Sequence, residues 1–285
     1  MVVTPQREGI LGFLRGVRRV VAAPAKTAGG VFNDWLKPEL DNLLEGTERL
    51  WKDPVTYIRG RSFGSECERA ITFDSLGHSV PFGAKKLRIF RTGRAIEKEI
   101  IDNMRQSPAF DSANVKLTYI DPPVNGRADV FMRRKSDGKL LCGEIKSIGQ
   151  NGWKRLPLEH GPTLAGDSPL MQTNRSYVMQ LNTYLGSDDS PTDEGFLLFE
   201  NKNDSAQRVY HIMFDARLRD GALAVSRSAA RYLETQTLAP VPKERDPRGE
   251  DKTCANCDHR YLCSVLAPEA VDYETMRQVD AEIRG

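Results

Sequence analysis

A long hydrophobic run is missing from this sequence. No apolar segment approaches the roughly 20 residues that a membrane-spanning helix needs. An apolar stretch followed by a small-residue cleavage site, the mark of a secretory signal peptide, is also missing. The sequence therefore predicts a soluble, intracellular protein of the cytoplasm.

Strong net charge is lacking as well. The 285 residues carry a formal net charge of only +2, although 28% of them are charged. Any surface for nucleic acid must then be a local patch rather than the whole protein. Two basic clusters exist, namely Arg15, Arg18 and Arg19, and Lys85, Lys86, Arg88 and Arg91. With 39% hydrophobic residues, the chain can form one large domain, or a core with a small accessory region.

Cysteine is scarce, and the number of cysteines is odd. Of the five, three fall within ten residues, which fits metal ligation in a reducing compartment better than a disulfide framework. A fourth lies far upstream, so the candidate ligands are Cys67, Cys254, Cys257 and Cys263. Four thiolates suit a 4Fe-4S cluster, but they also suit zinc, and His259 lies in the same segment; spacing alone slightly favours zinc. Cys142 is left over and is expected to be a small packed residue.

Periodicity and turn signals predict a mixed α/β chain. Residues 1–60 are expected to form an N-terminal helical extension. The expected elements after it are a helix at 85–106, a hairpin at 126–134 and 139–147, a helix at 169–185, strands at 195–200 and 208–214, and a helix from 216 to about 238. A linker rich in proline and charge follows at 239–253. The expected domains are thus the extension, a core over 61–238, and a linker with a cysteine cap over 239–285 that Cys67 completes.

The hairpin carries the most informative charged residues. The Asp137-Gly138 pair predicts a two-residue type I′ turn. In that register Asp129 lies opposite Lys146 and Phe131 lies opposite Glu144, so the two carboxylates and the lysine share one face. The other face collects Ala128, Val130, Met132, Leu141 and Ile145, an apolar set that supports this parity of pairing.

These residues suit phosphodiester hydrolysis. That reaction needs an activated water and neutralisation of charge at the phosphate and the leaving oxygen, which one or two divalent ions supply. Asp129 and Glu144 are expected to be ligands of Mg²⁺ or Mn²⁺, helped by the backbone carbonyl of Ile145. Lys146 is expected to orient or deprotonate the water and to offset transition-state charge.

The order of the motifs resembles the PD-(D/E)xK nuclease superfamily, and within it the RecB-type branch. The matching segments are Gly93 with Glu97, Gly126-Arg127-Ala128-Asp129, Gly143-Glu144-Ile145-Lys146, and Gln180-x-x-x-Tyr184. The cysteines make the chain similar to the iron-sulfur members, which include AddB-type helicase-nucleases and the RecB-like exonucleases associated with CRISPR adaptation. The resemblance implies a restriction-endonuclease-like nuclease core over 61–238, with a central mixed sheet flanked by helices.

The resemblance also implies roles for single residues. Glu97 would be a third metal ligand, although many relatives carry histidine there and the common proline before Asp129 is absent. Gln180 and Tyr184 would contact substrate phosphate or hold Lys146. The four-cysteine set would bind a 4Fe-4S cluster rather than zinc.

Together these patterns predict a divalent-metal-dependent DNA nuclease. By resemblance, the expected activity is an exonuclease on single-stranded DNA in recombination, repair or end processing. The long polar connection 149–167, with positive and aromatic residues around Trp153, is a candidate guide for a strand. Because no Walker-type segment is present, an alternative is a nuclease-fold DNA-binding subunit that is active only with a helicase or recombinase partner. A non-catalytic nucleic-acid-binding protein of the same fold is a further alternative.

Overall fold

The computed structural model describes residues 28–45, 51–62, 65–80, 82–249 and 251–284. The chain divides into two compact units, Met1–Thr47 and Glu48–Gly285. The described part of the first unit is helix α2 (Ala28–Glu45), which contains Pro38. Expectations for residues 1–27, including the first basic cluster, lie outside the described residues. Residues 51–60, which the sequence assigns to the extension, are part of the second unit.

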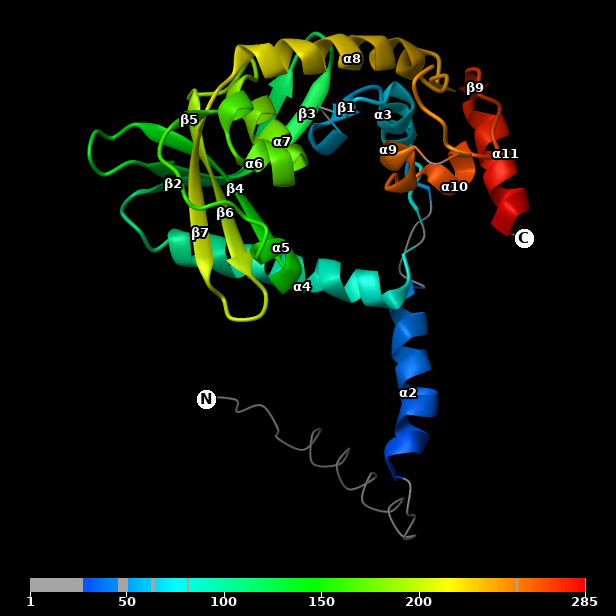
Figure 1. Ribbon diagram of the computed structural model, residues 1–285, viewed down its shortest axis with the longest axis horizontal. Helices are drawn as coiled ribbons and strands as arrows, with labels where there is room; N and C mark the ends of the chain where they lie inside the picture. The colour runs from blue at the N-terminus through cyan, green and yellow to red at the C-terminus, as the bar shows by residue number, and fades with distance from the viewer. Residues whose placement is uncertain (1–27, 46–50, 63–64, 81, 250, 285) are drawn as a thin grey trace, which may run out of the picture. The chain divides into compact units, whose positions relative to one another are not determined.

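The second unit contains the remaining helices and strands (Figure 1). Its α-helices are α3 (Glu68–Ser75), α4 (Ala84–Met104), α5 (Gln150–Trp153), α6 (Leu170–Thr173), α7 (Arg175–Leu185), α8 (Ala216–Glu234), α9 (Lys252–Ala255), α10 (Arg260–Cys263) and α11 (Tyr273–Arg284). Its strands are β1 (Ile58–Arg59), β2 (Phe110–Tyr119), β3 (Val124–Arg133), β4 (Leu140–Ile148), β5 (Thr163–Leu164), β6 (Glu194–Asn201), β7 (Gln207–Met213), β8 (Thr237–Leu238) and β9 (Val271–Asp272). None of the described helices is long and apolar enough to cross a membrane.

The central sheet has seven strands. Their order is β1-β3-β4-β6-β7-β5, with β2 paired to β3. Strands β1 and β3, β4 and β6, and β5 and β7 run parallel, whereas β2 and β3, β3 and β4, and β6 and β7 run antiparallel. The predicted class, a mixed sheet flanked by helices, is therefore confirmed.

Each face of the sheet is covered by a helix, because its strands are apolar on both sides. On one face Ile100 and Ile101 of α4 pack against side chains of β3, β4 and β6, namely Val130, Ile145, Phe196 and Leu198. On the other face α7 packs against a larger cluster, which includes Phe131, Cys142, Leu197, Phe199 and Tyr210. Cys142 is fully buried in this cluster, as expected of a small packed residue.

The register predicted for the hairpin is wrong by two residues. Phe131 pairs with Cys142, not with Glu144, and the expected pairing of Asp129 with Lys146 does not occur. Because the shift is even, Glu144 and Lys146 keep the face that the sequence predicts for them. Ala128 does not keep its predicted face: the sequence places it with Val130 and Ile145, but it packs in the cluster under α7.

The cause of the shift is the turn. Arg134 and Lys139 pair through their backbones, which leaves a four-residue loop between them. The Asp137 carboxylate binds the Arg134 guanidinium and accepts a hydrogen bond from the Lys139 amide. Gly138 takes a φ of 72°, which glycine tolerates best. The Asp-Gly pair thus ends a longer loop instead of forming a two-residue turn.

The helix predicted at 169–185 is interrupted. Asn174, with φ −139° and ψ 39°, separates α6 from α7. The residues of α7 still place Gln180 and Tyr184 one turn apart, as the sequence predicts.

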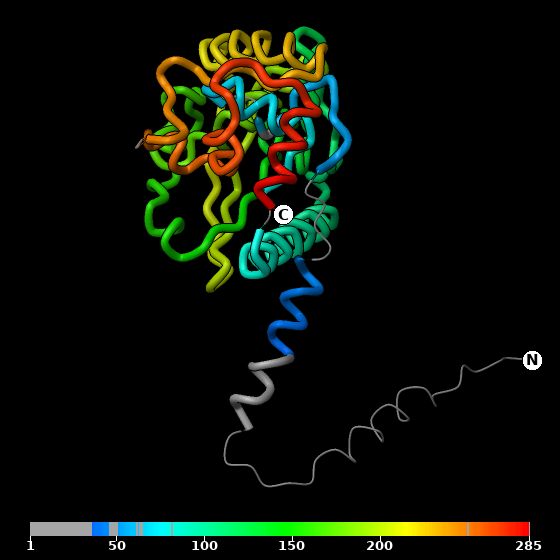
Figure 2. The backbone as a smooth tube through the Cα atoms, turned by 90° about the vertical axis from the view of Figure 1, so that its right-hand side faces the viewer, coloured from blue at the N-terminus to red at the C-terminus, as the bar shows by residue number. Residues whose placement is uncertain are grey.

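The segment after α8 folds back over α3 (Figure 2). Arg69 of α3 is 1% exposed, and its guanidinium donates hydrogen bonds to the carbonyls of Ala239, Ala267 and Glu269 at 2.8 to 3.0 Å. Burial of the guanidinium charge costs little free energy only because several carbonyl oxygens solvate it. Arg69 therefore fixes the chain on both sides of the cysteine-bearing segment.

A buried polar network also holds the cysteine-bearing segment in place. His78 lies 2.9 Å from His259 between their Nδ1 atoms, and its Nε2 lies 2.8 Å from the Tyr261 hydroxyl. That hydroxyl donates to Asp280, which also accepts from the Trp51 indole at 2.9 Å. Burial, together with the neighbouring His259, lowers the pKa of His78 to about 3, so the imidazole is neutral at physiological pH.

Candidate active site

One edge of β3 is shared by two different strands. β1 pairs with Val124 and Asn125, and β4 pairs with β3 from Val130 onward. In the part of the chain that the structure describes, residues 126–129 have no strand partner on that edge, while β2 pairs along the other. These four residues are the Gly-Arg-Ala-Asp motif, so the sheet is open at the motif for which the sequence predicts catalysis.

Asp129 lies at this open edge. It is 7% exposed, and its Oδ2 accepts a hydrogen bond of 2.8 Å from the amide of Ile145. Burial raises the pKa of Asp129, and the Ile145 amide and the Lys146 ammonium partly offset that shift. Asp129 thus takes the place of a strand partner for β4. The carbonyl of Ile145 as a metal ligand stays a prediction.

Glu144 and Lys146 form an ion pair beside Asp129. The Lys146 ammonium donates to Glu144 Oε1, and Glu144 is 1% exposed. Its second oxygen, Oε2, is buried and has no hydrogen-bond partner among the described residues. Burial raises the pKa of Glu144, Lys146 opposes the shift, and the charges of Asp129 and Glu97 add to it. Burial alone would lower the pKa of Lys146, but Glu144 and Asp129 hold it above its usual value.

Glu97 reaches the same group from α4. Burial and the negative charge of Asp129 raise its pKa, while Lys146 and Arg127 lower it. The helix approaches β4 closely at Gly93, one turn earlier, where a Cβ would lie 3.2 Å from the Ser147 hydroxyl oxygen. The two sequence motifs on α4 and β4 therefore meet in space.

This arrangement fits a hard divalent cation. No three His, Cys, Asp or Glu side chains among the described residues are placed to hold one ion together. Mg²⁺, however, is ordinarily held by one or two carboxylates, with water and substrate oxygens completing its shell. Asp129 and Glu144 supply two carboxylates, and the unpartnered Glu144 Oε2 is an acceptor that a cation would satisfy.

Gln180 and Tyr184 line the open edge from α7. Gln180 donates a hydrogen bond of 2.8 Å to the Tyr184 hydroxyl. Tyr184 is 3% exposed, and burial raises its pKa, with Glu144 and Asp129 adding to the shift. Its ring lies directly over Gly126, which leaves no room for a Cβ there. Tyr184 is thus a wall of the site; contact of either residue with substrate stays a prediction.

Tyr177 is a residue that sequence analysis missed. The Lys146 Nζ lies 5.3 Å from the centroid of the Tyr177 ring. Tyr177 precedes Gln180 by three residues and Tyr184 by seven, so all three share one face of α7. That spacing is the signal in the sequence that identifies it.

Substitution of Gly126 by alanine is expected to destabilise the fold by about 1 to 3 kcal/mol, because the added methyl group clashes with the Tyr184 ring. The displaced ring should also lower any activity of the site. Thermal unfolding measures the first effect. Gly221→Ala is the matched control: it lies within α8 with nothing near its Cβ position and should stabilise by up to about 1 kcal/mol. Equal stability of the two variants would contradict this packing argument.

The region around Trp153 is partly occupied. The Arg208 guanidinium lies 4.5 Å from the centroid of the Trp153 ring, which also packs against the cluster under α7. Lys154 and Arg155 are exposed beside it. A role of this segment in guiding a strand stays a prediction.

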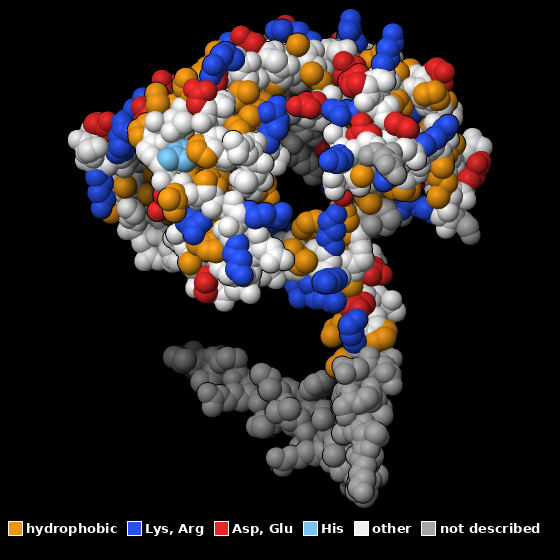
Figure 3. Space-filling view, viewed as in Figure 1, with side chains coloured by type: hydrophobic (Ala, Val, Ile, Leu, Met, Phe, Trp, Pro, Cys, Tyr) orange, Lys and Arg blue, Asp and Glu red, His pale blue; other side chains and the backbone are white. Residues whose placement is uncertain are grey.

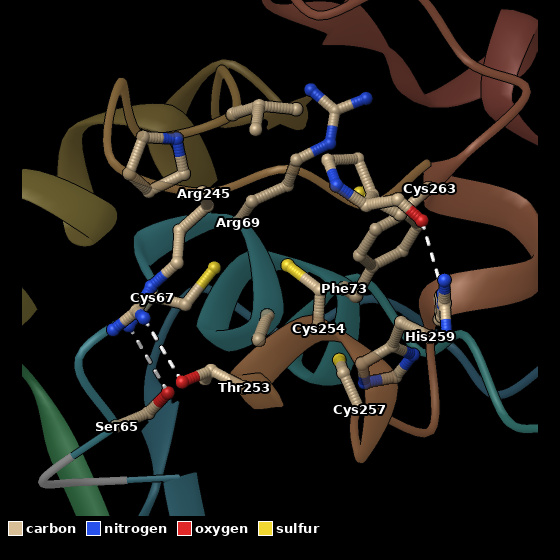
Figure 4. Close-up of a pocket in the computed structure, with 15 residues that line it drawn as sticks. Ser65, Cys67, Arg69, Phe73, Arg245, Thr253, Cys254, Cys257, His259 and Cys263 are labelled. Carbon is tan, nitrogen blue, oxygen red and sulfur yellow. Dashed lines mark hydrogen bonds between the residues drawn. The ribbon is translucent and has the colours of Figure 1, made fainter. Parts of the chain in front are cut away.

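The candidate cysteine ligands surround a second site. Cys67 is the residue just before α3, and the other three lie from α9 to the end of α10 (Figure 4). All four line one cavity of about 220 Å³. Burial raises the pKa of each thiol, that of Cys257 to about 11, and Cys67 is close enough to add to the shift at the other three.

Two arginines compensate charge at this cavity. Arg69 lowers the pKa of Cys67 and of Cys263, and Arg245 lowers that of Cys67 and of Cys254. Within the described parts of the chain, the Nε atoms of both arginines are buried and have no hydrogen-bond partner. Four soft thiolates and two cationic donors fit an anionic thiolate-bound metal group.

No family model and no curated protein matches this chain. Among solved structures, the crystal structure of SSO0001 is 16% identical; the match covers 81% of this chain and 95% of that one, with a TM-score of 0.46. The crystal structure of LHK-Exo in complex with dAMP is 12% identical, and the match covers 63% and 89% of the two chains with a TM-score of 0.38. At these values the likeness carries no information on activity.

Proposed function

We propose that this protein is a divalent-metal-dependent deoxyribonuclease. The observation that carries the proposal is the meeting of Glu97, Asp129 and Glu144 with Lys146 at the open edge of β3. Buried carboxylates that raise one another's pKa, beside a lysine, are typical of functional sites. The unpartnered Glu144 Oε2 favours a cation there over a purely structural ion pair.

The residues have distinct roles in this proposal. Asp129 and Glu144 would hold Mg²⁺ or Mn²⁺, and Glu97 would add a carboxylate from α4. When bound, such an ion neutralises phosphate charge and lowers the pKa of a water. Lys146, fixed between Glu144 and the Tyr177 ring, orients the attacking water and offsets charge on the phosphate. Hydrolysis joins the water oxygen to phosphorus and breaks the bond to the leaving oxygen, which takes up a proton.

The cysteine cavity is proposed to hold a 4Fe-4S cluster. Four thiolates line this cavity, and four is the number of thiolate ligands that a 4Fe-4S cluster takes. A cavity of about 220 Å³ has room for a group larger than one ion. Such a cluster would tie Cys67 at the start of the core to the segment after α8, and its role would be structural first.

Single-stranded DNA with a free end is the proposed substrate. The described surface of the second unit is hollowed through its middle, and several Lys and Arg side chains lie around the hollow, with some Asp or Glu side chains at its upper rim (Figure 3). Basic side chains that line a path of this kind can neutralise the phosphates of a single strand. A strand that enters by its end favours exonuclease action, in recombination, repair or end processing of DNA.

Substitution of Asp129 by asparagine tests the metal site. The variant is expected to bind Mn²⁺ at least about tenfold more weakly, because a ligand charge is lost while the shape is kept. Calorimetric titration of the full chain without DNA measures this, and the same variant should lose DNA cleavage. Asp220→Asn on the exposed surface of α8 is the control and should match the native protein. Native-like Mn²⁺ affinity in Asp129→Asn would place the ion elsewhere.

A further inference from the structure

The first half of α4 carries charge of one sign. Residues 82–96 contain no acidic residue, whereas their basic residues are Lys85, Lys86, Arg88, Arg91 and Arg94. The first turn of the helix has no acidic residue either. Cations near a helix N-terminus oppose the helix dipole and cost stability. The position of these basic side chains therefore does not stabilise the helix. Their charge creates a surface that attracts an anion.

Two aromatic rings lie within this basic surface. The rings of Phe82 and Phe90 meet edge to face, with centroids 5.2 Å apart. The Lys86 ammonium lies 3.9 Å from the Phe82 centroid and 5.8 Å from that of Phe90. Phe90 remains 38% exposed and its neighbour Ile89 is 47% exposed. The chain thus presents an aromatic ring and a cation together instead of burying the ring.

The same face of α4 leads to the candidate active site. Lys86, Phe90, Gly93 and Glu97 follow one another at intervals of four, three and four residues, so they form one stripe along the helix. Gly93 is the point of close approach to β4, and Glu97 belongs to the carboxylate group. Glu97 follows Phe90 by seven positions, which is about 10 Å along the helix axis.

The position of Lys86 is set from the cysteine-bearing segment. Its ammonium lies 3.2 Å from the carboxylate of Asp258, which directly follows Cys257. This exposed pair contributes little to stability. The pair is consistent with the place of the ammonium near both rings, on the side of α4 that faces the cysteine-bearing segment.

We propose that Phe82, Lys86 and Phe90 form a platform that binds single-stranded DNA about three nucleotides from the bond to be cut. The inference rests on the proposed nuclease function, because it takes Glu97 as part of the catalytic site. A base stacks on the exposed Phe90 ring, and the basic residues around it neutralise the flanking phosphates. The distance of about 10 Å corresponds to about three nucleotides of a stacked strand at 3.4 Å each.

Binding of a fluorescently labelled oligothymidine to the full chain in EDTA tests the platform without any need for cleavage. Phe90→Ala is expected to weaken binding about tenfold. Phe90→Leu, which stays apolar but cannot stack on a base, should weaken binding by a similar factor. Phe90→Trp, which can stack, should bind about as tightly as the native chain. Lys86→Gln should weaken binding and reduce the dependence of log affinity on log salt concentration by about one. Ile283→Ala in α11, a residue of similar exposure, is the control and should bind like the native chain.

The outcomes separate the platform from the nuclease. Affinity that depends on Phe90 supports the platform even if no metal supports cleavage, and in that case the proposed function alone fails. Native-like binding by Phe90→Ala and Phe90→Leu, in a chain that cleaves DNA, overturns the platform alone. Absence of binding to the native chain also overturns it, and leaves the exposed surface to a protein partner. Thermal unfolding of each variant excludes misfolding, since Phe90→Leu keeps most of the buried contact area.

Discussion

Replacing Lys146 by alanine is expected to lower DNA cleavage about a thousandfold while the fold persists. The Lys146 ammonium is the positive charge next to Glu144 and Asp129. Removal of one group that stabilises transition-state charge lowers the rate by about 10² to 10³. The rate falls further if the same group also transfers a proton. Glu144, whose pKa is already raised, takes up a proton when the lysine is gone, which limits the loss of stability. Initial rates on labelled DNA, together with thermal unfolding, measure both effects.

Lys139→Ala is the matched control for this substitution. Lys139 belongs to the same hairpin, but at its far end, where it pairs with Asp193 and Glu194. We expect its cleavage rate to stay within about twofold of the native rate, because Lys139 lies at the other end of the hairpin from Glu144 and Lys146. Equal rates for the two variants would mean that the catalytic site lies elsewhere.

Replacing Cys67 by serine is expected to remove the metal group from the cavity and to loosen the cap. Cys67, at the N-cap of α3, would supply one proposed ligand, whereas the other three cysteines lie in a single later segment. A group bound to all four closes a very long loop, so its loss frees the chain after α8. We expect a loss of bound iron, loss of visible absorption in anaerobically purified protein, and a drop in Tm of about 10 °C, equivalent to about 3 kcal/mol.

The control for this prediction is Cys142→Ala. Cys142 is buried under α7, in a core cluster distinct from the cysteine-lined cavity, so the variant should keep its iron and lose only packing free energy of about 1 kcal/mol. Retention of full iron content by Cys67→Ser would remove Cys67 from the ligand set. Zinc in place of iron in the native protein would keep the cavity as a metal site and contradict the cluster.

Strongly periodic elements could be predicted from the sequence, and weakly patterned ones could not. The helix expected at 85–106 and the strand at 195–200 correspond to α4 and β6 within a few residues. Strand β2 was missed because its segment contains Asp111, Ser112 and Asn114, residues typical of turns, and Asn114 has a positive φ of 58°. Its pairing with β3 overrides that local preference.

The candidate site shows the same division. The motif residues can be found by their order in the sequence, but the open edge of β3 cannot. That edge arises because β1, a two-residue strand from far upstream, pairs only with Val124 and Asn125. On the same edge of β3, the next four residues have no strand partner in the described chain, although β2 pairs along the other edge. The hairpin register failed for a local reason, since the Asp137 side chain binds Arg134 and lengthens the loop. Long-range pairing and side-chain competition in turns are not contained in periodicity.

Cleavage of end-labelled single-stranded DNA by the full, anaerobically purified chain tests the proposed nuclease most directly. With Mg²⁺ or Mn²⁺ we expect degradation that starts at one end, that stops in EDTA, and that is lost in Lys146→Ala. No cleavage by the native chain with either ion would contradict the assignment of a nuclease to the cluster of Glu97, Asp129, Glu144 and Lys146.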